Sequence, residues 1–116
     1  MTDPNCLFCK IAAKQIPSTT VYEDEDLVVF MDIAPQAPVH LVMAPRAHVI
    51  GLAGLTEELA PVVGRLALVA RDLADQLGID ESGYRLVTNN GPDAGQTVPH
   101  LHFHLLGGRP MGGRLA

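Results

Sequence analysis

The sequence contains few aromatic residues, no tryptophan, only two cysteines and no long apolar run. Because aromatic side chains make up only 4% of the chain, leucine, valine, isoleucine and alanine must fill most of its core. No apolar stretch approaches the roughly 18 residues of a membrane span, which excludes a transmembrane helix. A charged-then-apolar leader with a small-residue cleavage site is also missing. By default, these absences predict a cytoplasmic protein.

Positive charge is also scarce, and its distribution argues against binding to nucleic acid. The chain carries eight lysine and arginine residues against thirteen acidic ones, for a formal net charge of −5 at pH 7. The basic residues are scattered, whereas a nucleic-acid backbone is held by clustered lysine and arginine. An anionic ligand would need local donors such as backbone N–H groups, histidine or glutamine. We therefore expect a small-molecule ligand.

Length and composition predict one globular domain that spans residues 1–116. The 47% hydrophobic and 18% charged residues are typical of a folded globular chain. A chain of 116 residues has room for one hydrophobic core and buries only a modest fraction of its surface. For this reason we also expect the protein to form a dimer.

Apolar periodicity and turn residues predict an α+β fold, with an antiparallel sheet and a long helix on one face. The long helix is expected over residues 57–77, with Thr56 as its N-cap and Gly78 at its C-terminal end. Pro61 and Gly64 disfavour the first part of this range, so the helix could also start later. The other expected elements are a short helix within residues 6–15 and strands at 19–23, 27–31, 40–44, 84–88 and 101–106.

Three of the five histidines alternate along the last predicted strand, at His100, His102 and His104. Side chains alternate between the faces of a strand, so these imidazoles share one face and the intervening apolar residues share the other. Residues two apart on a strand are roughly 6.6–6.8 Å apart, so the three cannot easily bind one metal ion. Neutral imidazole can instead act as a base or as a nucleophile toward phosphorus. A merely solvated or hydrogen-bonded face is the alternative, but three histidines in register after a glycine-rich loop favour a functional role.

That glycine-rich loop, at residues 89–97, suits an anionic group. Gly91 and Gly95 permit unusual backbone angles, so we expect their amides to face phosphate oxygens. Gln96 and Thr97 add side-chain donors. The loop and the histidines together predict a phosphate site.

The run His100–Leu106 matches the signature His-φ-His-φ-His-φ-φ, where φ is apolar, and on it the chain is identified as a member of the histidine triad (HIT) superfamily. The match extends through further segments, namely Asp32–His40, Pro45–His48, Gly95–Val98 and Leu105–Pro110. Together these resemble the Hint branch, the purine nucleoside phosphoramidase-like proteins. The resemblance covers the chain from Cys6 to Arg109.

The resemblance implies a fold, an assembly and a reaction. The fold would be a five-stranded antiparallel sheet with a short N-terminal helix and one long helix, paired into a homodimer with a continuous ten-stranded sheet. The reaction would be hydrolysis of purine nucleoside 5′-phosphoramidates, derivatives of AMP or GMP, to nucleoside monophosphate and amine. It would pass through a covalent nucleotidyl-histidine intermediate, and no cofactor would be required for catalysis.

By the same resemblance, His102 is the nucleophile that attacks the α-phosphorus. His104 would contact the phosphate and assist the leaving group, with Thr97 near the same oxygens and His40 supporting the site from behind. Asp32 would hold the ribose hydroxyls, which suits a carboxylate that accepts two hydrogen bonds. The implied nucleotide-binding set, in which two phenylalanines and an isoleucine sandwich the base, is Phe8, Phe30, Asp32, Ile33, Asn89, Gly95, Gln96, Thr97, His102 and His104.

Cys6 and Cys9 form a Cys-x-x-Cys pair, which alone is a weak signal. A redox pair and two small buried residues are both open interpretations. Tetrahedral zinc needs four nitrogen or sulfur ligands, and His48 with His100 could complete a Cys₂His₂ set. Several bacterial histidine-triad proteins resemble this chain in carrying that set. The resemblance thus implies a structural zinc ion that ties the N-terminal helix to the histidine strand.

The chain departs from the family pattern at Pro99, where an aromatic residue is common, and in the tail Met111–Ala116, which lacks a Trp-Pro ending. The tail helps to choose leaving groups in the Hint branch, so this departure bears on specificity for the amine. Two other functions stay open: a zinc-stabilised nucleotide-binding or interaction module with incidental hydrolysis, and a nucleotidyl transferase. Transferase relatives tend to carry glutamine in place of the third histidine, so His104 favours hydrolysis.

Overall fold

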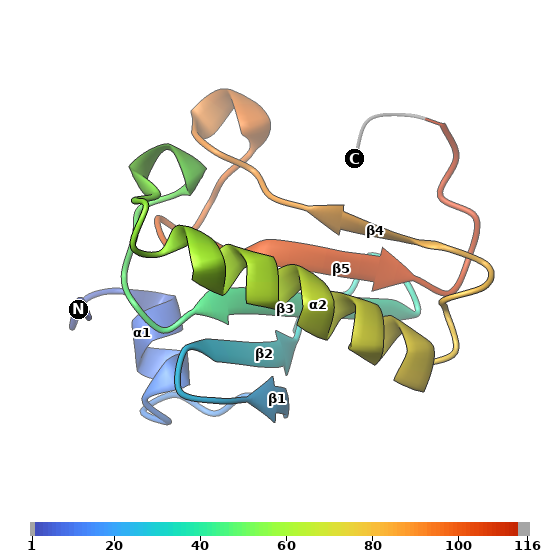
Figure 1. Ribbon diagram of the computed structural model, residues 1–116, viewed down its shortest axis with the longest axis horizontal. Helices are drawn as coiled ribbons and strands as arrows, with labels where there is room; N and C mark the ends of the chain where they lie inside the picture. The colour runs from blue at the N-terminus through green and yellow to red at the C-terminus, as the bar shows by residue number, and fades with distance from the viewer. Residues whose placement is uncertain (1, 114–116) are drawn as a thin grey trace.

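A five-stranded antiparallel sheet forms the centre of the computed structural model, which describes residues 2–113 (Figure 1). The strands are β1 (Thr20–Glu23), β2 (Leu27–Met31), β3 (Val39–Pro45), β4 (Tyr84–Val87) and β5 (Phe103–Gly107). Their order across the sheet is β1-β2-β3-β5-β4, and every neighbouring pair is antiparallel. The predicted α+β class and the five-stranded antiparallel sheet are confirmed.

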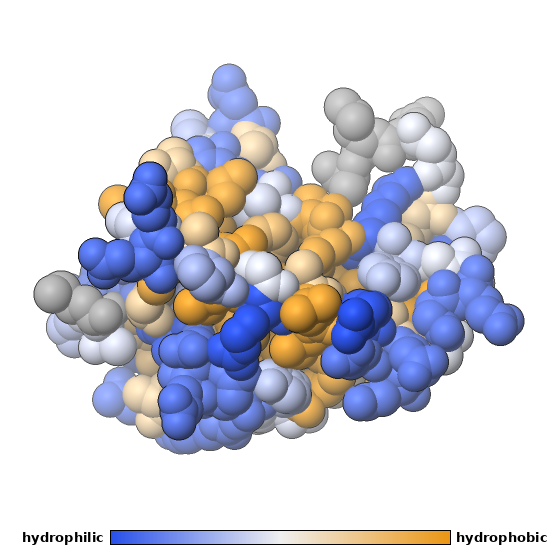
Figure 2. Space-filling view, viewed as in Figure 1, coloured by the Kyte–Doolittle hydropathy of each residue, from blue (hydrophilic) through white to orange (hydrophobic). Residues whose placement is uncertain are grey.

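Two helices cover opposite faces of this sheet. The long helix α2 (Ala60–Gln76) crosses β3 and β5 on the face turned to the viewer in Figure 1, and its buried side chains pack on that face. The short helix α1 (Leu7–Ala12) packs on the other face. Alternation along β2 supplies both cores, since Val29 points toward α2 and Phe30 toward α1. Figure 2 shows apolar side chains gathered in the middle of the α2 face, with hydrophilic ones around them.

The long helix begins at Ala60, so the alternative of a later start is confirmed, and the prediction of a start at residue 57 with Thr56 as N-cap is wrong. Pro61 lies in the first turn, where its missing N–H removes no helical hydrogen bond. The Thr56 hydroxyl instead accepts from the backbone N–H of Leu59 at 3.3 Å, in the turn that precedes the helix. The predicted C-terminal glycine is confirmed, because Gly78 follows the last turn with a left-handed φ of +74°.

The last strand begins at Phe103, so the prediction that it starts at residue 101 is also wrong. The amides of His100 and Leu101 donate to the carbonyls of Val98 and Val49, at 2.8 and 2.6 Å, and not to β3. These bonds hold the segment before β5 as a loop. As a result, only the third triad histidine lies within the strand itself.

The short helix ends at Ala12, before the expected limit at residue 15, and Lys14 beyond it has a left-handed φ of +63°. Two 3-10 turns lie in the connecting loops, η1 (Leu52–Gly54) and η2 (Pro92–Ala94). Among residues 2–113, no helix combines the length and the apolarity that crossing a membrane requires. Residues 114–116 of the divergent tail lie outside the described residues.

Candidate active site and metal centre

A cavity of about 380 Å³ opens between α1, β2 and the loop that precedes β5. All ten residues implied for nucleotide binding line this cavity. The residues expected to hold the base therefore share one pocket with the glycine-rich loop and with the histidines expected at the phosphate. Sequence reasoning missed further apolar lining residues, among them Leu7, Ile11 and Met31. The sequence spacing could have identified two of these lining residues, because Leu7 and Ile11 are four residues apart and so share one face of α1.

His102 lines this cavity and is only 6% exposed. Its Nδ1 lies 2.6 Å from the carbonyl oxygen of His100, and because a carbonyl only accepts, Nδ1 must carry the proton. The neutral ring therefore has its lone pair on Nε2. Phe8 meets the ring edge to face, with the centroids 4.8 Å apart. Burial lowers the pKa of His102 despite the opposing effects of the His100 carbonyl and Asp32, so the ring is neutral at pH 7.

A directional chain of hydrogen bonds ends at His104. The backbone N–H of Gln36 donates to His40 Nδ1 at 3.0 Å, so neutral His40 carries its proton on Nε2. That Nε2–H donates to His104 Nδ1 at 2.8 Å. By the same rule, neutral His104 carries its proton on Nε2 and presents a donor on its other side. The ring centroids of His104 and His102 are 5.1 Å apart, so this donor lies beside the nucleophile candidate.

Asp32, His40 and His104 also lie close enough to hold a metal ion, since their ligand atoms lie within 4.8 Å of one another. The hydrogen bonds favour a different role. A metal needs a lone pair, whereas His40 Nε2 carries a proton as long as the Gln36 amide holds Nδ1. Asp32 Oδ2 lies 3.4 Å from His40 Nε2, and Oδ1 accepts from the Ala34 amide at 2.8 Å. These three residues are better described as a hydrogen-bonded network that fixes which ring nitrogen of each histidine carries the proton.

We expect the unfolding free energy to fall as the pH drops from 6.5 toward 4, with His104 responsible for part of the fall. Burial and then the neighbouring His102 and His40 lower the pKa of His104 from its usual 6.5 to about 4, against the attraction of Asp32. Within this window the unfolded chain binds the proton and the folded chain does not. Stability is therefore fully present above pH 6.5 and is lost as the pH falls. Denaturant unfolding across the window measures the dependence.

The matched variant for this prediction is His104→Gln, because an amide does not titrate. Its unfolding free energy should depend less steeply on pH than that of the unmodified protein. Equal slopes for the two proteins would show that His104 keeps an ordinary pKa.

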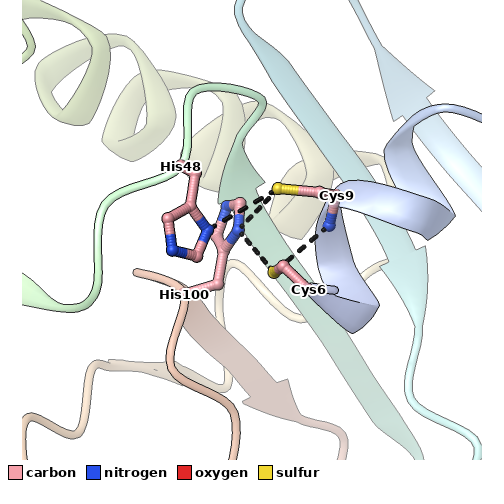
Figure 3. A group of neighbouring side chains, drawn as sticks. All are labelled: Cys6, Cys9, His48 and His100. Atoms are coloured by element: carbon pink, nitrogen blue, oxygen red, sulfur yellow. Dashed lines mark hydrogen bonds between the residues drawn. The ribbon is translucent and has the colours of Figure 1, made fainter. Parts of the chain in front are cut away.

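Cys6, Cys9, His48 and His100 converge beside α1, as the sequence predicted (Figure 3). His100 is fully buried, and its Nε2–H donates to the Pro45 carbonyl at 2.8 Å, which leaves a lone pair on Nδ1. Nδ1 faces both sulfur atoms, at 3.2 Å from Cys6 Sγ and 3.5 Å from Cys9 Sγ. His48 Nδ1 lies 3.6 Å from Cys9 Sγ. Four soft or borderline donors thus point at one another.

These separations fit tetrahedral zinc. Bonds of about 2.3 Å to sulfur and about 2.0–2.1 Å to nitrogen give tetrahedron edges of about 3.3–3.8 Å. On its far side, His48 Nε2 lies 3.9 Å from an Asp3 carboxylate oxygen, the kind of group that orients a ligating histidine. Burial raises the pKa of the Cys9 thiol, whereas a reactive redox cysteine needs a lowered one. The geometry therefore favours a metal over a redox pair.

Residues 13–111 match the family model of the HIT domain. The chain belongs to the HIT family. The purine nucleoside phosphoramidase of Escherichia coli is 44% identical over 110 residues, which cover 95% of this chain and 92% of that protein. The 14 kDa zinc-binding protein of Zea mays is 47% identical over 113 residues, which cover 96% of this chain and 88% of that protein. A HIT family hydrolase from Clostridium thermocellum has a TM-score of 0.95 and 46% identity, covering 99% of this chain and 100% of that one. This HIT protein is therefore an enzyme, a hydrolase.

The glycine-rich loop of this HIT enzyme uses its donors differently from the prediction. The Gly91 amide donates to Gln96 Oε1 at 2.8 Å, and the Gly95 amide donates to a carbonyl of the same loop at 3.0 Å. Gln96 Nε2 donates to the carbonyls of Ile50 and Val98, at 2.8 and 3.0 Å, so both of its N–H groups are used. Gly95 and Gln96 line the cavity as expected, but the expectation that these amides face phosphate oxygens does not hold.

A second cavity, of about 390 Å³, adjoins the first. Asn89 and His104 line both of them. Arg85 from β4 and Arg109 and Met111 from the C-terminal segment contribute to the second one. His104 of this HIT enzyme therefore stands at the junction of two cavities.

Proposed function

We propose that this HIT hydrolase cleaves purine nucleoside 5′-phosphoramidates, such as adenosine phosphoramidate, to nucleoside monophosphate and amine. The observation that carries the proposal is the hydrogen bond from His102 Nδ1–H to the His100 carbonyl, which leaves the lone pair on Nε2. A neutral imidazole with a free lone pair is a nucleophile toward phosphorus. The name of the Escherichia coli relative, a purine nucleoside phosphoramidase, supports the substrate class.

The apolar end of the first cavity suits a purine nucleoside. Phe8 and Phe30 are buried and meet edge to face with their centroids 5.4 Å apart. Ile33 is 98% exposed beside them, and a base stacked in the cavity would cover it. The carboxylate of Asp32 would accept hydrogen bonds from the ribose hydroxyls. Because the base wall is apolar and unselective, we expect both AMP and GMP derivatives to bind.

The reaction would take two displacement steps at the α-phosphorus. His102 Nε2 attacks, the bond from phosphorus to the amine breaks, and the departing nitrogen takes the proton from His104 Nε2 while a proton from solvent replaces it, so the His104 ring stays neutral. Water then attacks phosphorus, the bond to His102 breaks, and the proton that this water loses returns to solvent. His40 keeps His104 in the required tautomer through its own Nε2–H. Thr97 and Asn89 line the cavity and would donate to the phosphate oxygens.

The second cavity would receive the departing amine, because it opens beside His104 away from the nucleoside pocket. Met111, the first residue of the divergent tail, lines this cavity. The tail would therefore influence which amines are accepted.

Release of AMP from adenosine 5′-phosphoramidate tests the proposal. The purified protein should form AMP and ammonia with water as the acceptor. Added orthophosphate separates hydrolysis from the transferase alternative, since a transferase would form ADP. Tight AMP binding without any release would support the binding module and contradict the proposal.

We also propose one structural zinc ion held by Cys6, Cys9, His48 and His100. The donor geometry and the name of the Zea mays relative, a zinc-binding protein, support this site. Bound zinc would supply a cross-link and no catalytic chemistry. The cross-link would join α1 to the loop after β3 and to the loop before β5.

We further propose that residues 1–116 form a single HIT domain that pairs into a homodimer. β4 lies at one edge of the sheet, and an edge strand has free backbone groups that can pair with a second copy. Tyr84 on β4 and Leu68 on α2 are exposed by 39% and 51%, which a second copy would reduce. Light scattering should therefore give twice the chain mass of 12.4 kDa. A single-chain mass at micromolar concentration would rule the pairing out. A cytoplasmic location stays a prediction of the sequence.

A further inference from the structure

The glycine-rich loop, which lines the first cavity, is joined to a second loop by the side-chain amides of Asn90 and Gln96. One loop contains η1 and the other contains η2, and these two turns lie next to each other in Figure 1. Asn90 Oδ1 accepts from the Ala53 amide at 2.8 Å. Gln96 Nε2 donates to the Ile50 carbonyl at 2.8 Å. The glycine-rich loop is thus bonded twice to a segment about 40 residues earlier in the chain.

Gly51 lies against both amides and leaves no room for a larger residue. A Cβ at Gly51 would lie 2.6 Å from Asn90 Oδ1 and 3.3 Å from Gln96 Oε1. The φ of Gly51, −176°, is extended backbone that any residue adopts. A Cβ at Gly51 would therefore displace the end of the Asn90 side chain, whereas the backbone conformation itself would accept any residue.

Gln96 also closes the loop to which it belongs. Its Oε1 accepts from the Gly91 amide at 2.8 Å, and its Nε2 donates to the Val98 carbonyl at 3.0 Å. Gly91 and Val98 flank residues 92–97, so the two bonds hold both ends of this segment. Because Thr97 directly follows Gln96, its position depends on these bonds.

We propose that Gly51, Asn90 and Gln96 form a clamp that positions Thr97 at the phosphate end of the cavity. The inference rests on the proposed function, because it takes phosphate to be the group bound there. Asn90 is not among the described residues that line either of the two cavities, so it acts through the loop. The base end is independent of the clamp, because its aromatic residues come from α1 and β2.

The test compares Asn90→Ala and Gly51→Ala with Asn90→Asp, which keeps an Oδ1 acceptor for the Ala53 amide. Titration with AMP and with adenosine separates the phosphate end from the base end. For both alanine variants, AMP affinity and kcat/KM should fall about 10-fold, while adenosine affinity stays within about twofold of the unmodified protein. Asn90→Asp should keep the adenosine affinity of the unmodified protein and lose less kcat/KM than Asn90→Ala, because its Oδ1 still accepts from the Ala53 amide.

Equal losses of AMP and adenosine affinity would show a general disruption of the site. No loss of AMP affinity in either alanine variant would show that the loop keeps its position without these bonds. Each of these results overturns the clamp. Amide hydrogen exchange gives a readout that needs no nucleotide: the Ala53 and Gly91 amides should exchange about 10-fold faster in the alanine variants. Unchanged exchange overturns the clamp whatever the activity. An unmodified protein that releases no AMP contradicts the proposed function instead, and the exchange rates still decide the clamp.

Discussion

Replacing His102 with alanine should lower the turnover of adenosine 5′-phosphoramidate by about 10⁴-fold or more, as expected when a catalytic nucleophile is removed. The variant has no Nε2 lone pair, so the covalent intermediate cannot form. The nucleoside walls come from α1 and β2 and stay in place, so AMP affinity should change by less than about 10-fold. Mass spectrometry under single-turnover conditions should find a nucleotidyl adduct on the unmodified protein and none on the variant.

His104→Gln is the comparison variant, because it removes the proton donor and leaves His102 intact. This variant should release AMP more slowly and still form the adduct on His102. A His102→Ala protein that works at the unmodified rate, or an adduct on another residue, would refute the nucleophile assignment. An unchanged melting temperature would show that lost turnover does not reflect unfolding.

The histidine pattern predicted the site better than it predicted the strand. His100 and His102 lie before β5, so the assumption of a continuous strand failed. Their rings nevertheless lie on one face, since Phe8 meets both of them edge to face and His102 meets His104 in the same way. The two-residue alternation needs extended backbone and does not need a partner strand, so the prediction of a shared face survived.

The protonation of the site could not be predicted from the sequence. His40 and His104 are 64 residues apart, and the tautomer of each depends on a bond that only the folded chain makes. The same holds for Gln96, which the sequence suggests as a phosphate donor but whose partner at Ile50 is 46 residues away. Residue type identifies which groups can donate, and tertiary packing decides to whom they donate.

The start of the long helix was hard to predict for a different reason, because two local sequence preferences compete there. Thr56 satisfies the preference for a hydroxyl N-cap, and Pro61 satisfies the preference for proline in the first turn. The chain follows the proline, and the threonine closes a separate turn before the helix. Both residues were recognised in the sequence, but their relative weight depends on how α2 docks on the sheet.

Removing the metal should cause a large loss of stability, which we expect to be about 4 kcal/mol in the unfolding free energy. A ligand present at about 1,000 times its Kd stabilises the folded state by about that amount. The four donors come from three separate segments, at residues 6–9, 48 and 100, so the unfolded chain does not hold them together. For a domain of this size the melting temperature should fall by about 15 °C. Thermal unfolding before and after chelation, together with elemental analysis for zinc, measures the effect.

Cys9→Ser should reproduce the effect of chelation and bind less than one zinc ion per chain, because a serine hydroxyl is a poor zinc ligand. Ala13→Ser is the matched control, since it adds a hydroxyl at an exposed position just beyond α1. Leu7 and Phe8 lie between the two cysteines and line the nucleoside cavity, so a loosened α1 should raise KM more than it lowers kcat. If the purified protein contains no zinc and added zinc does not raise its melting temperature, the metal site is refuted, and Cys6 and Cys9 are then small buried residues that pack α1 on the sheet.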